Sequence, residues 1–144
     1  QNQEYKRFAM EQAVTLRKLQ AKSSEDQVSG FFFSSASSTE PYKNIWNGCE
    51  ELFALCDLVE MFPSESDVSV WKESITGYTR NYLLFIARKN NFGIVPFGLF
   101  TQDDPGGNKK SGEYWYRYFM QPEMDWWVGI NANLASSGIG LLKA

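Results

Sequence analysis

The chain has 144 residues, of which 43% are hydrophobic and 22% charged, a composition typical of one folded globular domain. Its formal net charge is −3 and its Lys and Arg residues are scattered, which argues against a nucleic-acid partner because neutralising phosphates needs a basic surface. Histidine is absent, so Ser-His-Asp and Cys-His nucleophile systems and zinc sites with imidazole ligands are excluded.

The first predicted element is an amphipathic helix over residues 4–21. Apolar side chains recur there every three or four positions with charged residues between them: Tyr5, Phe8, Ala9, Ala13, Leu16 and Leu19. A polar loop follows at 22–27, and residues 28–46 contain three consecutive Phe residues flanked by small polar side chains. Pro41 disfavours a long helix in that segment.

A second helix is predicted over residues 47–62, with Asn47 as the N-cap and Glu50 three positions later. Its apolar stripe contains Cys49 and Cys56, the two cysteines of the chain. Seven residues of helical rise separate them by about 10 Å, which is too far for a disulfide. Two thiols do not make a structural zinc site alone, so we expect two buried thiols on one helix face.

The third predicted helix runs from about 69 to 89, with Ser66 or Asp67 as its N-cap. One apolar stripe follows it, formed by Trp71, Ile75, Tyr78, Tyr82, Phe85 and Ile86. Gly93 suits the left-handed backbone position that ends many helices, and Pro96 prevents the helix from continuing.

Residues 92–124 carry little regular signal, and a loop of that length in a compact domain is usually functional. A last helix, capped by Asp125, is predicted to continue to the end of the chain. The sequence therefore predicts an all-α fold of about four helices in antiparallel pairs. Apolar side chains such as Leu134, Ile139 and Leu142 lack obvious partners, so we expect residues 1–144 to be one segment of a larger helical domain, incomplete at both ends.

The segment 112–134 is unusually aromatic. Rings and charged or amide side chains alternate there without a clean period, so some of the rings are expected to face water or a ligand. The rings of this segment are Tyr114, Trp115, Tyr116, Tyr118, Phe119, Trp126 and Trp127.

Three runs of the sequence resemble the middle of the catalytic domain of family 9 glycoside hydrolases, most closely the bacterial members with an Ig-like module ahead of that domain. The runs are "EPYKNIWNGCEELFALCDLVEMFP", "NNFGIVPFGLF" and "YWYRYFMQPEMDWWVGINANLASSGIGLLKA". The resemblance covers the chain from about Tyr5 to its end.

The resemblance implies an (α/α)6 toroid with a sugar cleft built from loops and helix termini, and hydrolysis of β-glycosidic bonds with inversion. The family's catalytic base is an Asp in an Asp-Ala-Gly-Asp type motif, and its acid is a Glu near the end of the domain. This sequence contains no Asp-x-Gly-Asp and stops before the expected acid. We therefore assign no catalytic residue and expect the segment to supply part of the cleft wall.

The resemblance also implies a secreted or periplasmic enzyme that needs no cofactor. Its partners are then a β-glucan-type polysaccharide or oligosaccharide and the remainder of the same catalytic domain. The first ten residues are polar, so we expect any export signal to lie outside this chain. No apolar run approaches the roughly 18 residues of a membrane span.

Aromatic and amide side chains together suit a sugar cleft, because a pyranose face packs on a ring while its hydroxyls need donors and acceptors at the edge. The predicted substrate-binding residues are Trp46, Asn47, Tyr114, Trp115, Tyr116, Arg117, Tyr118, Trp126, Trp127 and Asn131, with Asn133 as a further amide. The alternative is that these rings are core. For Trp46 and Asn47 the alternative is a hydrophobic staple with an N-cap.

The sequence leaves two other interpretations open. Glu113, Glu123 and Asp125 offer carboxylates for inverting hydrolysis, although Asp125 is more simply a helix N-cap. The loop "DDPGGN" offers oxygen ligands for calcium, but its spacing is not that of an EF-hand and Asp-Pro-Gly is ordinary turn chemistry. The alternative to an enzyme is a carbohydrate-binding or helical scaffold module without catalysis.

Overall fold

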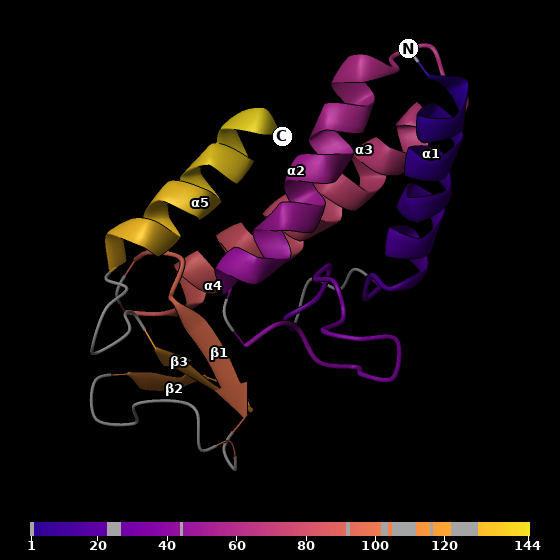
Figure 1. Cartoon of the computed structure of the whole chain (residues 1–144). Coiled ribbons are helices and arrows are strands. Elements are labelled where there is room, and N and C mark those ends of the chain that lie inside the picture. The colour runs from indigo at the N-terminus through magenta and orange to yellow at the C-terminus, as the bar shows by residue number, and fades with distance from the viewer. Residues whose placement is uncertain are drawn as a thin grey trace.

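A computed structural model describes residues 2–22, 27–43, 45–91, 93–101, 104, 112–115, 117–121 and 130–144 (Figure 1). The side chains of residues 46, 47, 113 and 130–136 lie outside this description. Its elements, in chain order, are α1 (Gln3–Lys18), α2 (Ile45–Met61), α3 (Val68–Thr76), the π-helical segment η1 (Gly77–Leu83), α4 (Leu84–Lys89), β1 (Gly98–Thr101), β2 (Glu113–Trp115), β3 (Tyr118–Gln121) and α5 (Ile130–Lys143).

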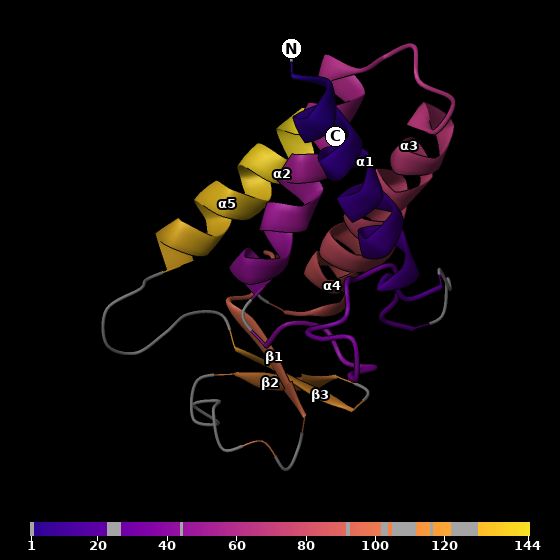
Figure 2. The same ribbon diagram turned by 45° about the vertical axis from the view of Figure 1, so that its right-hand side comes forward.

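The helices pack around α2. Figures 1 and 2 show α1 and α3 on one side of α2 and α5 on the other, while the small sheet lies below the lower ends of the helices. Gly140 lets α5 approach α2 closely, because a Cβ there would lie 2.7 Å from a methyl of Leu52. An ion pair between Lys143 and Asp57 joins the end of α5 to α2.

Helices dominate the described chain, and those predicted over 4–21, 47–62 and 69–89 are confirmed with small shifts of their ends. The all-α prediction is wrong, however, because β1, β2 and β3 form an antiparallel sheet in the order β1-β3-β2. These strands have only three or four residues each, which is too short for a two-residue alternation to stand out. The predicted cap Asp125 lies outside the described residues.

The start of α2 differs from its prediction. The helix begins at Ile45, so Asn47 is inside its first turn and is not the N-cap. The N–H of Ile45, which has no acceptor within the helix, donates to the carbonyl of Phe97 at 3.0 Å, just before β1. Cys49 and Cys56 are both buried and unbridged on α2, as predicted.

The predicted helix over 69–89 is continuous but widens into a π-helix at its centre. The hydroxyl of Thr79 donates to the carbonyl of Ile75 at 2.8 Å, which competes with the backbone bond that an α-helix would make there. At its start, Asp67 occupies the N-cap position but makes no side-chain capping bond. The buried rings of Tyr78 and Tyr82 lie 5.1 Å apart along this segment.

The Phe-rich segment packs on η1 through a close backbone contact. Gly30 has φ +74°, and a Cβ at this position would lie 2.6 Å from the carbonyl carbon of Gly77. The side-chain amide of Gln20 donates to the carbonyls of both Gly30 and Ser74 at 2.8 Å. The end of α1, the segment after it and the end of α3 are thereby joined at one point.

Aromatic contacts also hold the Phe-rich segment against η1. The ring of Phe32 stacks on that of Tyr78 with centroids 5.2 Å apart, and the ring of Phe31 lies 5.6 Å from that of Tyr82. Both Phe side chains are buried in the main core. The triple Phe therefore acts as an anchor for the chain that leads from α1 to α2.

The sheet places two sets of side chains on its two faces. Leu99 pairs with Met120 and Trp115 with Tyr118, and these four side chains face the helical core. Phe119 pairs with both Phe100 and Tyr114 on the opposite face. The N–H of Leu99 donates to the carbonyl of Lys43 at 2.9 Å, which fixes β1 beside the segment before α2.

Two left-handed glycines in the described part of the chain, Gly30 and Gly93, allow a matched test of the contact between Gly30 and Gly77. We expect Gly30→Ala to lower the free energy of unfolding by more than about 4 kcal/mol, because strain of about 1–2 kcal/mol is added to overlap with backbone atoms. Gly93 has a similar φ of +68° and open space around it, so Gly93→Ala should cost only about 1–2 kcal/mol. Urea unfolding of both variants measures the difference. Equal losses would contradict the proposed role of the close contact.

Candidate functional site

A polar cleft of about 490 Å³ lies where the segment before α2 runs beside β1 and β3. The segment supplies one wall and the two strands supply the other. The residues that line the cleft are Ser34, Ser38, Glu40, Pro41, Tyr42, Lys43, Leu99, Thr101, Asp104 and Tyr118. Hydroxyls, carboxylates, an ammonium group and two phenol rings therefore converge on one space.

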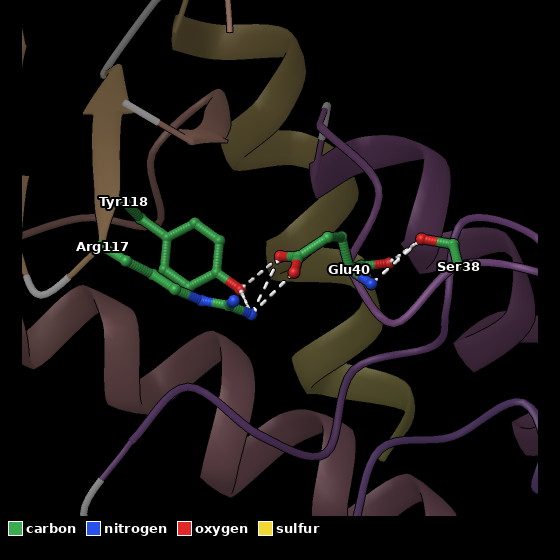
Figure 3. Close-up of polar contacts among 4 residues, drawn as sticks. All are labelled: Ser38, Glu40, Arg117 and Tyr118. Carbon is green, nitrogen blue, oxygen red and sulfur yellow. Dashed lines mark hydrogen bonds and ion pairs between the residues drawn. The ribbon is translucent and has the colours of Figure 1, made fainter. Parts of the chain in front are cut away.

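Glu40 is joined to two side chains from the aromatic stretch (Figure 3). The hydroxyl of Tyr118 donates to Oε2 of Glu40 at 2.8 Å, and a guanidinium nitrogen of Arg117 lies 2.8 Å from Oε1. Arg117 also donates to the hydroxyl of Tyr118 at 2.9 Å. The three groups form a closed set of hydrogen bonds, with the guanidinium 5.0 Å from the ring centre of Tyr118.

The local backbone holds Glu40 in place. The backbone N–H of Glu40 donates to the hydroxyl oxygen of Ser38 at 3.0 Å, which closes a small turn (Figure 3). Glu40 also precedes Pro41, and a residue before proline favours an extended backbone. These local preferences direct the carboxylate across the cleft towards β3.

The electrostatics of this set keep Tyr118 neutral. Burial raises the pKa of the Tyr118 phenol well above its ordinary value of 10.0, and the Glu40 carboxylate raises it further, while Arg117 opposes the change. The phenol is therefore a hydrogen-bond donor to Glu40 across the whole physiological pH range. Glu40 keeps acceptor capacity for a ligand, because each carboxylate oxygen has two lone pairs.

A second ion pair lies in the cleft between Lys43 and Asp104, whose atoms Nζ and Oδ2 are 2.7 Å apart. The Asp104 side chain is 9% exposed, whereas that of Lys43 is 63% exposed. Arg117 is likewise more exposed than Glu40, at 51% against 35%. The carboxylates therefore form the inner surface of the cleft, and the cations lie towards its rim.

Behind the cleft, the phenol of Tyr42 donates to Oε1 of Glu51 on α2 at 3.0 Å. Burial raises the pKa of the Glu51 carboxyl, and the nearby charge of Glu50 adds to this, while the backbone N–H of Glu51 and the Tyr42 bond oppose it. Within the described structure three buried side-chain oxygen atoms have no hydrogen-bond partner, and all lie in this region: Glu51 Oε2, Tyr78 Oη and Tyr82 Oη.

The predicted substrate-binding residues are distributed over several environments. Tyr118 lines the cleft, and Arg117 bonds to the cleft residues Glu40 and Tyr118 without lining the cleft itself. Trp115 is half-buried and its ring lies edge-on to Phe85 at 5.3 Å, which is a packing role. Tyr114 is 55% exposed on the opposite face of the sheet. Tyr116, Trp126 and Trp127 lie outside the described residues, as do the side chains of Trp46, Asn47, Asn131 and Asn133.

Glu40, Tyr42 and Lys43 were not predicted from the sequence. The available signal was the Glu-Pro-Tyr-Lys run, in which Pro41 forces an extended backbone. Nothing in the sequence connects Glu40 with Tyr118, which follows 78 residues later. Of the calcium loop considered above, Asp104 is described and pairs with Lys43.

The described residues contain no group of three or more His, Cys, Asp or Glu side chains arranged to hold a metal ion. Among them there is also no helix of the length and apolar character needed to cross a bilayer. Comparisons with protein-family models, curated proteins and solved structures find no match.

Two tyrosines give a matched test of buried hydroxyls. Tyr82→Phe is expected to leave the free energy of unfolding unchanged or to raise it by up to about 1 kcal/mol, because the hydroxyl has no partner to lose. Tyr118→Phe removes a bond to a carboxylate and should lower the free energy by about 1.5 kcal/mol or more. Denaturant unfolding measures both. A loss for Tyr82→Phe as large as that for Tyr118→Phe would show that the buried hydroxyl has a partner.

The raised pKa of Glu51 predicts a pH dependence of stability. The folded state binds the Glu51 proton more tightly than the unfolded state, so this stabilising effect is present below the ordinary value of 4.5 and is lost as pH rises through the folded-state pKa. Glu51→Gln should therefore raise the thermal midpoint relative to the wild type at pH 7, and the gain should vanish near pH 4. Thermal melts across this range measure the gain. A constant gain at every pH would exclude ionisation as its cause.

Proposed function

We propose that this chain forms part of the catalytic domain of a glycoside hydrolase that cleaves β-glucan-type polysaccharides or oligosaccharides with inversion. In this proposal the polar cleft beside β1 and β3 binds the saccharide, and the catalytic carboxylates come from the remainder of the domain. Such an enzyme would act outside the cell or in the periplasm, because polysaccharides are too large to enter.

One observation carries the saccharide proposal: the carboxylate of Glu40, bonded to Tyr118 and Arg117, lies in the wall of a cleft of about 490 Å³. That volume falls in the usual range of small-molecule sites. Fixed carboxylates accept hydrogen bonds from sugar hydroxyls, and the Ser and Thr hydroxyls of the cleft both donate and accept. The ring of Tyr42 adds apolar surface for the C–H face of a sugar.

Exposed apolar side chains support the idea that further helices of the same domain pack here. An apolar groove of about 560 Å³ runs between α1 and α2. Three of its lining side chains are exposed, Tyr5 by 73%, Phe8 by 61% and Met61 by 56%. Separately, Leu142 at the end of α5 is 89% exposed. Contiguous exposed apolar surface of this kind marks an interaction site.

The second candidate is a carbohydrate-binding module or helical scaffold without catalysis. It is favoured by the sequence itself, which contains no Asp-x-Gly-Asp motif. The gene's reading frame separates the two candidates. An Asp-rich motif encoded before Gln1 and a Glu encoded beyond Ala144 favour the enzyme, and their absence favours the module.

Calorimetric titration of the 144-residue chain with β-glucan oligosaccharides tests the cleft. Glu40→Gln keeps the side-chain shape but removes the charge, so we expect affinity to fall about tenfold or more, as for loss of a hydrogen bond to a charged group. Glu50→Gln is the matched control, because Glu50 is exposed on α2 and is not part of the cleft. Circular dichroism confirms that both variants fold. Absence of binding by the wild type, or equal binding by all three proteins, would refute the proposal.

A further inference from the structure

Tyr42 connects the cleft to the half-buried carboxyl of Glu51. Its side chain lines the cleft, while its hydroxyl donates to Oε1 of Glu51 at 3.0 Å. Tyr42 belongs to the segment before α2 and Glu51 to α2 itself, so the bond joins the cleft wall to the central helix. A ring held by a hydrogen bond at its far end has a fixed orientation in the wall.

The carboxyl of Glu51 destabilises the folded state. Its second oxygen, Oε2, is buried and has no hydrogen-bond partner in the described structure. A buried polar atom without a partner destabilises a protein, so a carboxyl at this position is not explained by packing. What the carboxyl does provide is the acceptor for Tyr42.

We propose that Glu51 is a positioning residue for the saccharide cleft: its ionised carboxylate fixes the phenol of Tyr42 in the cleft wall, and protonation of the carboxyl weakens that bond. This inference rests on the proposed saccharide function. It assigns Glu51 no contact with the ligand, because Glu51 acts only through Tyr42.

The surroundings of Glu51 make its charge state responsive to pH. Among the described residues, the titratable groups that influence it are Glu50 and Cys49 on α2, Tyr78 on η1 and Tyr42 itself. None of these groups is a cation, so the Tyr42 bond is the side-chain contact that favours the ionised form. The pKa of the carboxyl lies above its ordinary value because burial outweighs this bond. The cleft wall therefore changes at a pH above the usual range of glutamate.

The first test needs no ligand. The protein is labelled with 13C in its tyrosine rings, and the Tyr42 signal is assigned by its loss in Tyr42→Phe. We expect the Tyr42 ring signal to titrate with a midpoint above 4.5 in the wild type, and at a lower pH in the Glu50→Gln control, because the charge of Glu50 contributes to the raised pKa of Glu51. In Glu51→Gln the signal should be flat. A flat signal in the wild type, or a titration that persists in Glu51→Gln, would overturn the inference.

The second test measures affinity for a β-glucan oligosaccharide over the same pH range. Acidification through the Tyr42 midpoint should weaken binding by about threefold to tenfold in the wild type and in Glu50→Gln, as for loss of one hydrogen bond. Glu51→Gln and Tyr42→Phe should bind with a low, pH-independent affinity. If the wild-type affinity stays constant as pH passes through the Tyr42 midpoint, the positioning role of Glu51 is overturned. A Tyr42 signal that titrates in a protein that binds no saccharide would instead reject the proposed function and leave the coupling of Tyr42 to Glu51 supported.

Discussion

The close approach of Gly30 to Gly77 decides where the chain between α1 and α2 can run. Only a residue without a Cβ fits against the Gly77 carbonyl, and only glycine readily adopts the left-handed backbone found there. Once this point is fixed, Phe31 and Phe32 reach the rings of η1, and the chain after them is led towards the sheet. The position of the cleft wall that contains Glu40 depends on this contact.

The opposite wall depends on backbone bonds to the same segment. The carbonyl of Lys43 accepts from the N–H of Leu99, and the carbonyl of Phe97 accepts from the N–H of Ile45. Strand β1 is thus attached on both sides of the start of α2, and β3 follows from its pairing with β1. Main-chain hydrogen bonds therefore hold the two walls of the cleft together, and the polar side chains project from these walls. Rigid mounting of this kind is what a binding site requires.

The helices were predictable because each carries a long apolar stripe, and three or four turns of repetition override local ambiguity. The strands were not predictable, because three or four residues are too few to show a two-residue alternation. The aromatic content of the region suggested a ligand-binding surface and not a sheet. The start of α2 was predicted two residues late because the N–H of Ile45 bonds to the carbonyl of Phe97, a contact far along the chain that no local sequence signal shows. Arg117 and Tyr118 were predicted as site residues from their type. Their partner Glu40 was not, because the contact is tertiary and leaves no trace in spacing.

The two thiols of α2 have a consequence for how this protein opens. Cys49 is fully buried and Cys56 nearly so, and burial raises the pKa of Cys49 to about 11. A thiol of that kind holds almost no thiolate at neutral pH and cannot be reached by an alkylating reagent while the helix is packed. Modification of Cys49 must then wait for α2 to separate from its neighbours. The rate at which Cys49 is alkylated in native buffer therefore measures how often α2 separates from its neighbours. Because α2 also supports the cleft, the same rate reports on local opening beside the cleft.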